Sequence, residues 1–298
     1  MKVYYDTKML ADIGRHTSPS SMKPKQVLAA MEEIGENILV VPPITATRDD
    51  FYRAHDPEFV DGVLSGRIAN GFGNRSIDVI KSLPYTSGSL LSGAIDAVKY
   101  HTISCSLTSG FHHAGYDFAG GFCTFNGLMV AALYMLEHQK CSRIAIIDCD
   151  QHYGNGTEDI IKRKGLSDKI LHVSFGEYYH SPKHSEKYLT HMNSLERRFG
   201  DFAPDLIIYQ AGADSHINDP LGGVLTTEQM YLRDKTMFEY ALKLDIPMVY
   251  NLAGGYQRDA DGGISKVINI HVNTYLAYLN VWHKQENQIL GGGNHVSI

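Results

Sequence analysis

Cysteine is scarce in this chain, and the few residues have no spacing that suggests cross-links. The 298 residues include four cysteines, Cys105, Cys123, Cys141 and Cys149, and no Cys-x-x-Cys pair occurs. All four lie in or beside apolar segments, which favours reduced, buried thiols. The sequence therefore indicates neither a disulfide framework nor a zinc ribbon.

Long apolar runs and an excess of positive charge are also missing. No stretch approaches the roughly 20 apolar residues that a membrane span requires, and the segment Met1–Lys8 lacks the apolar core of a signal peptide. The formal net charge of -6 at pH 7 argues against a general nucleic-acid binder, which needs basic residues to neutralise phosphates. We therefore expect a cytoplasmic protein that binds neither membranes nor nucleic acid.

Apolar runs of two kinds alternate along the chain and predict an α/β fold. Short runs typical of strands are Ser104–Thr108, Arg143–Asp148, Lys169–Ser174, Asp205–Gln210 and Pro247–Leu252, and amphipathic runs typical of helices are Gly88–Tyr100, Phe125–His138, Thr157–Lys164, His184–Phe199 and Thr226–Leu244. This alternation favours a mostly parallel central sheet with helices on both faces, a three-layer α/β/α arrangement. We expect one domain over residues 1–298, in which about 285–298 form a flexible tail.

Polar residues follow four of these strands at the point where each strand ends. These segments are Phe111–His113, Asp148–His152, Gly212–Asp214 and Gly254–Tyr256. Ligands of open parallel sheets bind outside the carboxyl ends of the strands. We therefore expect the four segments to meet in one functional site.

The segment from Asp148 to Thr157 carries metal-binding side chains at alternating positions. In an extended chain, Asp150 and His152 point to the same side as Asp148. Carboxylate and imidazole donors gathered in this way predict a divalent metal site and a metallohydrolase. The same segment also suits a strand end that caps the next helix through Asn155 or Thr157, with no metal.

Five separated motifs, taken together, resemble those of a known enzyme family. The motifs are His112-His113-Ala114, Gly120–Asn126, Asp148–Thr157, Gln210–Asp214 with Asp219-Pro220 after it, and Gly254–Tyr256. In order and spacing they resemble the zinc-dependent histone deacetylases and acetylpolyamine amidohydrolases of the arginase/deacetylase fold. The resemblance spans roughly residues 5 to 280 and is closer to the second class of the family.

That resemblance implies a metal centre. Asp150, His152 and Asp214 would bind Zn(II) and leave one position open for water or substrate. One nitrogen and two carboxylate ligands also suit Fe(II), Co(II) or Mn(II), so the choice of zinc rests on the family. His216 repeats the Asp-x-His spacing after Asp214 and is a rival ligand on spacing alone.

The resemblance also implies catalytic roles for four residues. His113 would be the general base that takes a proton from water and returns it to the leaving amine. His112, hydrogen-bonded to Asp148, would be held more cationic and act electrostatically. Tyr256 would donate its hydroxyl to the oxyanion of the tetrahedral intermediate, although its alternative role is only to pack under the preceding glycine turn.

A substrate channel and a second ion are further implications of the family. An apolar channel suits acetyl-lysine, whose four methylenes each contribute about 0.8 kcal/mol when buried. Leu221 stands where polyamine-selective members carry an acid, which favours acyl-lysine over a polyamine. The channel residues would be Gly121, Phe122, Tyr178, Tyr179 and Leu221, and main-chain carbonyls at Asp148, Asp150, His152, Ser174 and Phe175 would bind a structural potassium ion.

Tyr153 replaces a second histidine found in many members after the ligand histidine, and two further departures from the family pattern bear on the histidine pair. Phe111 stands directly before His112, and the proline often found in this loop is absent. Asn155 replaces the aspartate that orients the general base in some members. A neutral amide stabilises an imidazolium less than a carboxylate does, so we expect a lower pKa for His113 than in those members.

The motifs together predict a metal-dependent amide hydrolase that removes acetyl or other acyl groups from lysine side chains of proteins or peptides. One alternative is hydrolysis of a small-molecule amide, such as an acetylated polyamine. A second is a non-catalytic module that binds acyl-lysine. The presence of both His113 and Tyr256 disfavours the second alternative, because a binding module has no need of them. The sequence leaves the oligomeric state and the acyl chain length open.

Overall fold

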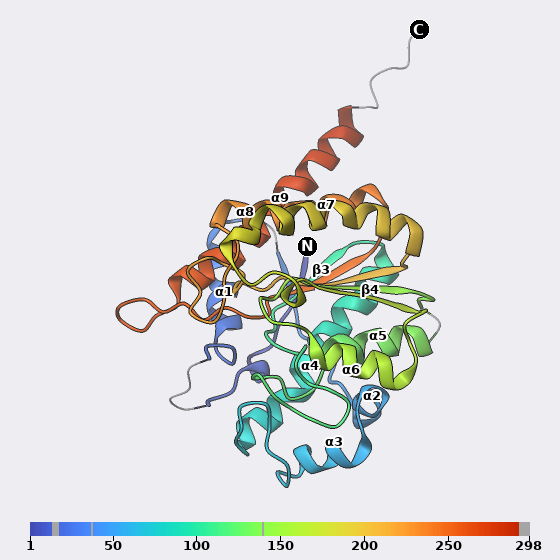
Figure 1. The fold of residues 1–298 in the computed structure, drawn as a ribbon, viewed down its shortest axis with the longest axis vertical. Helices are drawn as coiled ribbons and strands as arrows, with labels where there is room; N and C mark the ends of the chain where they lie inside the picture. Colours follow the sequence, from blue (N-terminus) through green and yellow to red (C-terminus); the bar gives the residue numbers. More distant parts are fainter. Residues whose placement is uncertain (14–17, 37, 139, 292–298) are drawn as a thin grey trace.

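A parallel β-sheet of seven strands forms the middle layer of the molecule (Figure 1). The computed structural model describes residues 1–13, 18–36, 38–138 and 140–291. Within these residues the strand order is β2-β1-β3-β7-β6-β4-β5, and every pair of neighbours is parallel. The strands are β1 (Lys2–Tyr4), β2 (Leu39–Val41), β3 (Ile103–Ser106), β4 (Ile144–Asp148), β5 (Ile170–Ser174), β6 (Leu206–Gln210) and β7 (Met248–Asn251).

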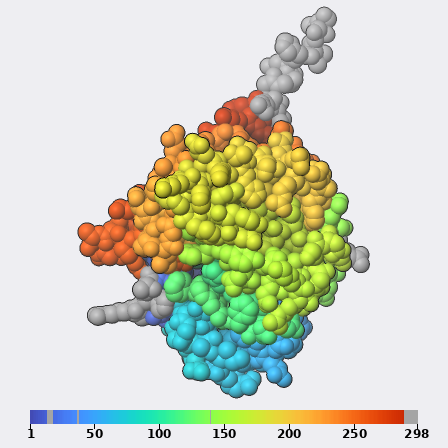
Figure 2. All heavy atoms as spheres, viewed as in Figure 1, coloured from blue at the N-terminus to red at the C-terminus, as the bar shows by residue number. Residues whose placement is uncertain are grey.

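Helices cover both faces of this sheet (Figure 1). On one face lie α1 (Lys23–Glu33), α7 (Ser185–Phe202), α8 (Thr227–Lys243) and α9 (Ser265–Gly291). On the other lie α2 (Arg48–Ala54), α3 (Pro57–Leu64), α4 (Ile77–Tyr100), α5 (Gly127–Glu137) and α6 (Asn155–Lys164). In Figure 2, α7 (yellow) and α3 (blue) lie toward opposite ends of the visible face. The predicted three-layer α/β/α fold with a mostly parallel sheet is confirmed.

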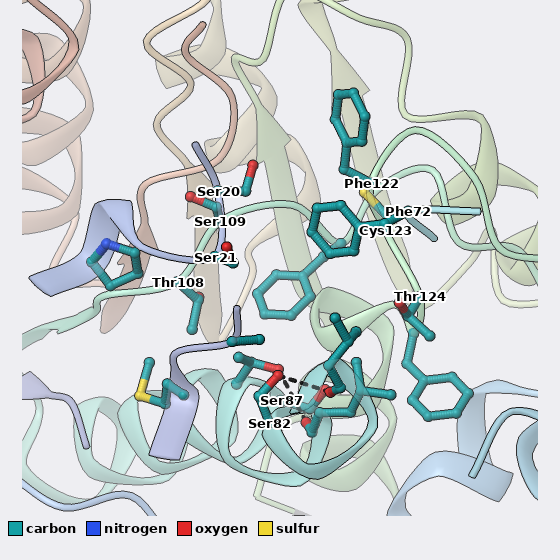
Figure 3. Close-up of a pocket in the computed structure, with 18 residues that line it drawn as sticks. Ser20, Ser21, Phe72, Ser82, Ser87, Thr108, Ser109, Phe122, Cys123 and Thr124 are labelled. Atoms are coloured by element: carbon teal, nitrogen blue, oxygen red, sulfur yellow. Dashed lines mark hydrogen bonds between the residues drawn. The ribbon is translucent and has the colours of Figure 1, made fainter. Parts of the chain in front are cut away.

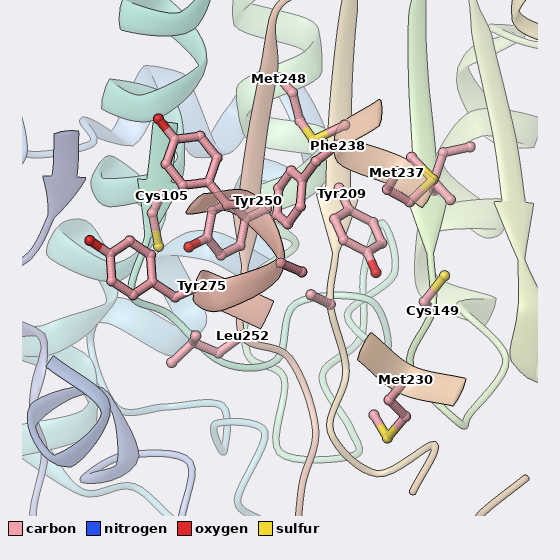
Figure 4. Close-up of a cluster of buried hydrophobic side chains, with 14 of the residues drawn as sticks. Cys105, Cys149, Tyr209, Met230, Met237, Phe238, Met248, Tyr250, Leu252 and Tyr275 are labelled. Atoms are coloured by element: carbon pink, nitrogen blue, oxygen red, sulfur yellow. The ribbon is translucent and has the colours of Figure 1, made fainter. Parts of the chain in front are cut away.

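Two hydrophobic cores fill the spaces between the sheet and its helices. On β4, Ile147 faces the core under α7, α8 and α9, whereas Ile146 faces the core under α4 and α5. This alternation follows from the two-residue period of a strand, and burial on both faces explains why β4 is apolar up to its last residue, Asp148. Figure 4 shows part of the first core, where Phe238 of α8 packs edge-on against Tyr250 of β7 with ring centroids 5.4 Å apart.

The elements predicted from the sequence are present. The five predicted strands correspond to β3 to β7, and the five predicted helices correspond to α4 to α8. Helix α8 begins with a reciprocal cap, in which the Thr226 hydroxyl accepts from the Gln229 N–H and the Gln229 side chain accepts from the Thr226 N–H. Helix α4 begins at Ile77 rather than at Gly88, and Pro84 lies inside it.

Other elements were missed for lack of a local pattern. Strands β1 and β2 have three residues each, and β2 lies at the sheet edge with Leu39 58% exposed, so neither shows a buried apolar run. Helix α9 continues to Gly291, so residues 285–291, expected as part of a flexible tail, are helical; residues 292–298 lie outside the described residues. All four cysteines are buried and unpaired, as predicted. None of the described helices is both long and apolar enough to cross a bilayer.

Candidate metal centre

The four polar segments meet because their strands are neighbours in the sheet. Strands β3, β7, β6 and β4 are consecutive in the strand order, and all point the same way. The loops that follow them carry the histidine pair, the Gly254–Tyr256 turn, Asp214 and the segment Asp150–His152. The carboxyl edge of the sheet therefore gathers residues that are more than 140 positions apart in the chain.

Asp150, His152 and Asp214 form a group with the geometry of a metal site. Within the described residues, one ligand atom from each lies within 4.8 Å of the others. The Nδ1 atom of His152 is 3.1 Å from Asp150 Oδ1 and 3.0 Å from Asp214 Oδ2. The three side chains offer one nitrogen and two oxygen donors, the set expected from the sequence.

The Leu221 carbonyl fixes the tautomer of His152 through the second ring nitrogen. Nε2 lies 3.0 Å from the carbonyl oxygen of Leu221, and a carbonyl only accepts, so Nε2 carries the proton and donates. The Nδ1 lone pair of the neutral ring then points at two carboxylate oxygens, an arrangement that needs a cation between them. Hydrogen bonds to Asp150 and Asp214 raise the pKa of His152 to about 11, so a proton fills this place unless a metal displaces it.

Main-chain N–H groups hold the two carboxylates in place. Asp150 accepts from Gly254 N–H at 2.8 Å and from His152 N–H at 3.0 Å, and Asp214 accepts from Gln151 N–H at 3.0 Å. Burial and the neighbouring Asp150 raise the pKa of the Asp214 carboxyl to about 7. Two buried carboxylates that repel each other in this way favour binding of a divalent cation.

Gly254 lies where a side chain would collide with both carboxylates. A Cβ atom at this position would overlap Asp214 Oδ2 and lie 2.7 Å from Asp150 Oδ2. Replacing Gly254 with alanine should therefore push the carboxylates apart and weaken metal binding by about 10- to 100-fold. The measurement is a Co(II) titration of metal-free protein, with Gly200→Ala as the control because that position on α7 has no atom within 4 Å. An unchanged dissociation constant for Gly254→Ala would contradict the placement of these carboxylates.

The adjacent histidines have opposite electrostatic environments. His112 is buried, its Nδ1 lies 2.7 Å from Asp148 Oδ2 and its Nε2 lies 3.6 Å from Asp150 Oδ1. Burial disfavours the charged ring, but these carboxylates outweigh it and raise the pKa of His112 to about 9. Burial, followed by the charge on His112, lowers the pKa of His113 to about 4. The ring of His113 is held through Nδ1, 2.6 Å from Asn155 Oδ1.

Helix α6 positions the histidine pair and does not use the proposed cap. The N–H groups of Gly156 and Thr157 donate to the His112 carbonyl at 2.9 and 3.1 Å. The N-cap of α6 is Gly154 without a side-chain hydrogen bond, so the interpretation of the segment as an Asn155 or Thr157 cap is wrong.

Tyr256 lies across the site from the histidines. Its ring centroid is 6.4 Å from that of His152 and 5.8 Å from that of Phe122, and its N–H donates to Asp219 Oδ2 at 2.8 Å. Burial and the charges of the nearby carboxylates raise the pKa of Tyr256 far above its usual value, so the hydroxyl stays protonated and can donate. The other oxygen of Asp219 accepts from Leu221 N–H at 3.0 Å. Asp219 therefore fixes both Tyr256 and Leu221, a role that its place in the Asp-Pro motif had not revealed.

Three of the five expected channel residues lie around this site. Gly121 has φ +52, and a Cβ there would run into the His113 ring. Phe122 stacks on Phe72 with centroids 5.9 Å apart and an interplanar angle of 28°, and Leu221 is 49% exposed. Behind Phe122 is a cavity of about 60 Å³, lined also by Phe72, Phe111 and a group of serines and threonines (Figure 3).

The other two expected channel residues lie on the side of α7. Tyr179 donates to or accepts from His191 Nδ1 at 3.1 Å, and Tyr178 packs edge-on against the same histidine with ring centroids 5.9 Å apart. No ring contact among the described residues joins either tyrosine to Phe122, His152 or Tyr256. Phe122 instead has ring contacts with Tyr256 and with Phe72, which the sequence did not single out.

His216, the rival ligand, lies outside the cluster. Its Nε2 is 3.0 Å from Thr227 Oγ1 and its Nδ1 is 3.1 Å from Gln257 Nε2. Lys23 is instead close to the site and was not expected there. It is fully buried, donates to the Ala253 and Gly254 carbonyls at 2.5 and 3.2 Å, and burial lowers its pKa to about 8. An isolated lysine in a polar N-terminal segment carries no signal that would have identified it.

Comparison with known families agrees with this geometry. The model of the histone deacetylase domain matches residues 18–187 and 180–275. The chain belongs to the histone deacetylase family. This membership confirms the resemblance inferred from the five motifs.

Relatives in the histone deacetylase family include proteins named for two different substrates. Histone deacetylase 2 of Arabidopsis thaliana is 25% identical over 258 residues, which are 76% of this chain and 65% of that protein. Acetylpolyamine amidohydrolase 1 of Pseudomonas aeruginosa is 30% identical over 179 residues, 51% of this chain and 50% of that protein. A crystal structure of acetylpolyamine aminohydrolase from Burkholderia pseudomallei superposes with a TM-score of 0.74 at 17% identity, over 94% of this chain and 99% of that one.

Proposed function

We propose that the chain is a metal-dependent hydrolase that removes acetyl or other acyl groups from lysine side chains of proteins or peptides. The observation that carries the proposal is the convergence of three groups around His152. Its ring centroid is 5.9 Å from that of His113 and 6.4 Å from that of Tyr256, and its Nδ1 faces two carboxylates. A metal site, a base and a hydroxyl donor are then within reach of one amide group.

Asp150, His152 and Asp214 would hold the divalent ion, for which Zn(II) is the family's metal and Fe(II) also suits the ligands. When bound, the ion would act as a Lewis acid and lower the pKa of a water molecule from about 15.7 to about 7. Main-chain carbonyls of the segments Asp148–His152 and Ser174–Phe175 would bind a structural potassium ion. Asp148 of β4 pairs with Ser174 of β5, so the carbonyl-bearing segments proposed for it lie side by side.

The division of labour between the histidines follows from their electrostatics. His113 has its pKa lowered to about 4, so its ring is neutral at pH 7 and Nε2 is available to take a proton from water and return it to the leaving amine. His112, with its pKa raised to about 9, stays charged beside Asp148 and stabilises negative charge. Tyr256 donates its hydroxyl to the oxygen that becomes negative in the tetrahedral intermediate.

Replacing Asn155, which holds the ring of His113, should shift the pH dependence of kcat/KM. In Asn155→Asp, a carboxylate replaces the amide 2.6 Å from His113 Nδ1 and stabilises the charged ring. The pKa of His113 rises, so the base is protonated at higher pH, and the acid limb of kcat/KM should move upward by about 1 pH unit or more. A pH series of kcat/KM measures this, with Asn193→Asp on the surface of α7 as the matched exchange. An acid limb that stays in place would remove His113 from the role of base.

The nature of residue 221 supports acyl-lysine as the substrate class. Leu221 is exposed, its carbonyl contacts His152, and its side chain offers no charge to a second ammonium group of a polyamine. Hydrolysis of a polyamine remains the second candidate, since one relative carries the name acetylpolyamine amidohydrolase.

The deciding experiment compares an acetyl-lysine peptide with N-acetylspermidine, each with and without a chelator. We expect faster hydrolysis of the peptide and loss of both activities after metal removal. Leu221→Glu should raise kcat/KM for the polyamine relative to the peptide. Faster hydrolysis of the polyamine by the wild type would replace the first substrate class by the second, and activity that survives metal removal would overturn the metal mechanism.

A further inference from the structure

Arg233 of α8 lies beside the backbone that carries the metal-binding carboxylates. It is the largest fully buried side chain among the described residues. Its Nη1 donates to the carbonyl oxygen of Gly212 at 2.9 Å and to that of Cys149 at 3.2 Å. Cys149 directly precedes Asp150, and Gly212 is two residues before Asp214. One nitrogen atom therefore joins two turns that follow the neighbouring strands β4 and β6. These turns supply the two carboxylates.

The guanidinium is held by the Asp234 carboxylate, which is itself held by two further donors. Its Nε donates to Asp234 Oδ1 at 2.8 Å, and that carboxylate also accepts from the Tyr209 hydroxyl of β6 and from Thr274 Oγ1 of α9 at 2.6 Å. Residues of α8, β6 and α9 therefore fix the position of the Arg233 guanidinium, whose Nη1 atom joins the two turns. The Ser215 hydroxyl adds a second bond to the Cys149 carbonyl at 2.8 Å.

Stability alone gives a poor account of this arginine. Replacing a buried ion pair by uncharged groups of similar size is often neutral or stabilising, because the charges lose their hydration on burial. The Nη2 atom of Arg233 is buried and has no hydrogen-bond partner among the described residues, which adds to that loss. The turns it joins are also in close contact, since a Cβ on Gly212 would lie 2.6 Å from the Asp150 Cα. A small change in their separation would directly change the separation of the carboxylates.

We propose that Arg233 is a positioning residue for the metal centre. By holding the Cys149 and Gly212 carbonyls at one point, it sets the spacing between the Asp150 and Asp214 carboxylates and thereby the affinity and geometry of the bound ion. The inference rests on the ligand set of the proposed function and is independent of the substrate.

The test uses Co(II) as the probe and reads metal binding rather than turnover. Metal-free wild type is compared with the double variant Arg233→Met/Asp234→Asn, which removes both charges of the buried pair and leaves an acceptor for Tyr209. We expect the Co(II) dissociation constant to rise by about 10- to 100-fold, with a changed visible absorption spectrum of the Co(II) form. The metal-free double variant should still unfold cooperatively. The control is Arg197→Met/Asp201→Asn, the same two exchanges in an exposed pair on α7, which should leave the constant and the spectrum unchanged.

Arg233→Lys is the second variant, because it keeps the charge and is less disruptive to folding. An ammonium group lacks the planar fork that reaches Asp234 and both carbonyls together, so we expect about tenfold weaker Co(II) binding. Wild-type affinity and spectrum in the folded double variant would overturn the proposal. If the double variant does not fold, wild-type Co(II) affinity and spectrum in Arg233→Lys would overturn the proposal. Failure of the wild type to bind Co(II) would instead refute the ligand set, and failure to hydrolyse acyl-lysine would leave the positioning role intact.

Discussion

The variant Asp214→Ala should lose both metal binding and amide hydrolysis. Asp214 supplies one of three donor atoms that lie within 4.8 Å of one another, and its removal leaves one carboxylate and one imidazole. Loss of an outer partner of a metal ligand already costs about 10- to 100-fold in affinity, so loss of a ligand itself should exceed about 100-fold. Co(II) titration of the metal-free protein and hydrolysis of an acetyl-lysine peptide measure the two effects.

Two comparisons make this result specific. Asp201→Ala removes a carboxylate from the exposed surface of α7 and should leave metal affinity and activity unchanged. His216→Ala removes the rival ligand, whose nearest partners are Thr227 and Gln257, and should leave metal affinity at the wild-type value. Wild-type metal affinity in Asp214→Ala would show that the ion is held elsewhere and would refute the proposed ligand set and mechanism.

The variant Tyr256→Phe should lower kcat by about 100- to 1,000-fold, which corresponds to about 2.7 to 4 kcal/mol of transition-state stabilisation. The exchange removes only the hydroxyl. Burial and the carboxylates keep that hydroxyl protonated, so in the wild type it is always present as a donor. KM for an acetyl-lysine peptide and the Co(II) dissociation constant should change little, because Tyr256 is not among the ligands.

Steady-state kinetics with a control tyrosine test this expectation. Tyr100→Phe removes a hydroxyl from an exposed position at the end of α4 and should have wild-type kcat. If Tyr256→Phe retained wild-type kcat, the tyrosine would only pack under the Gly254–Gly255 turn, and another group would have to stabilise the oxyanion. A rise in KM with unchanged kcat would indicate a role in binding rather than in the chemical step.

The fold was predictable from the sequence where its signal was local. Strands β4 and β6 are apolar runs that each end in a polar residue, with Asp150 and Asp214 within four residues of the strand end, so both the strand and its functional end are visible in the same ten residues. The edge strand β2 has no such signal, because its side chains are partly exposed and its pairing with β1 depends on residues distant in the chain. Helix α4 begins before the predicted start at Gly88 and contains Pro84, since a proline inside a helix removes one hydrogen bond without necessarily ending the helix.

Some residues of the candidate site were likewise predictable from the sequence, and others were not. The three donors and the histidine pair follow strand ends and belong to contiguous motifs, so the sequence alone predicts that they share one site. Lys23 and Arg233 come from helices on the outer layer, where single basic residues usually face solvent. Their burial depends on carbonyl groups of turns elsewhere in the chain, and no pattern around either residue records those partners.

Leu221 contributes to the site in two independent ways, through its main-chain carbonyl, which accepts from His152, and through its side chain. The main chain of Leu221 fixes the tautomer of a proposed metal ligand, while its side chain is exposed. The side chain at this position can therefore be exchanged without removing the hydrogen bond that orients His152. A change in loop length between Asp219 and Leu221 would instead move the Leu221 carbonyl and therefore the ring of His152.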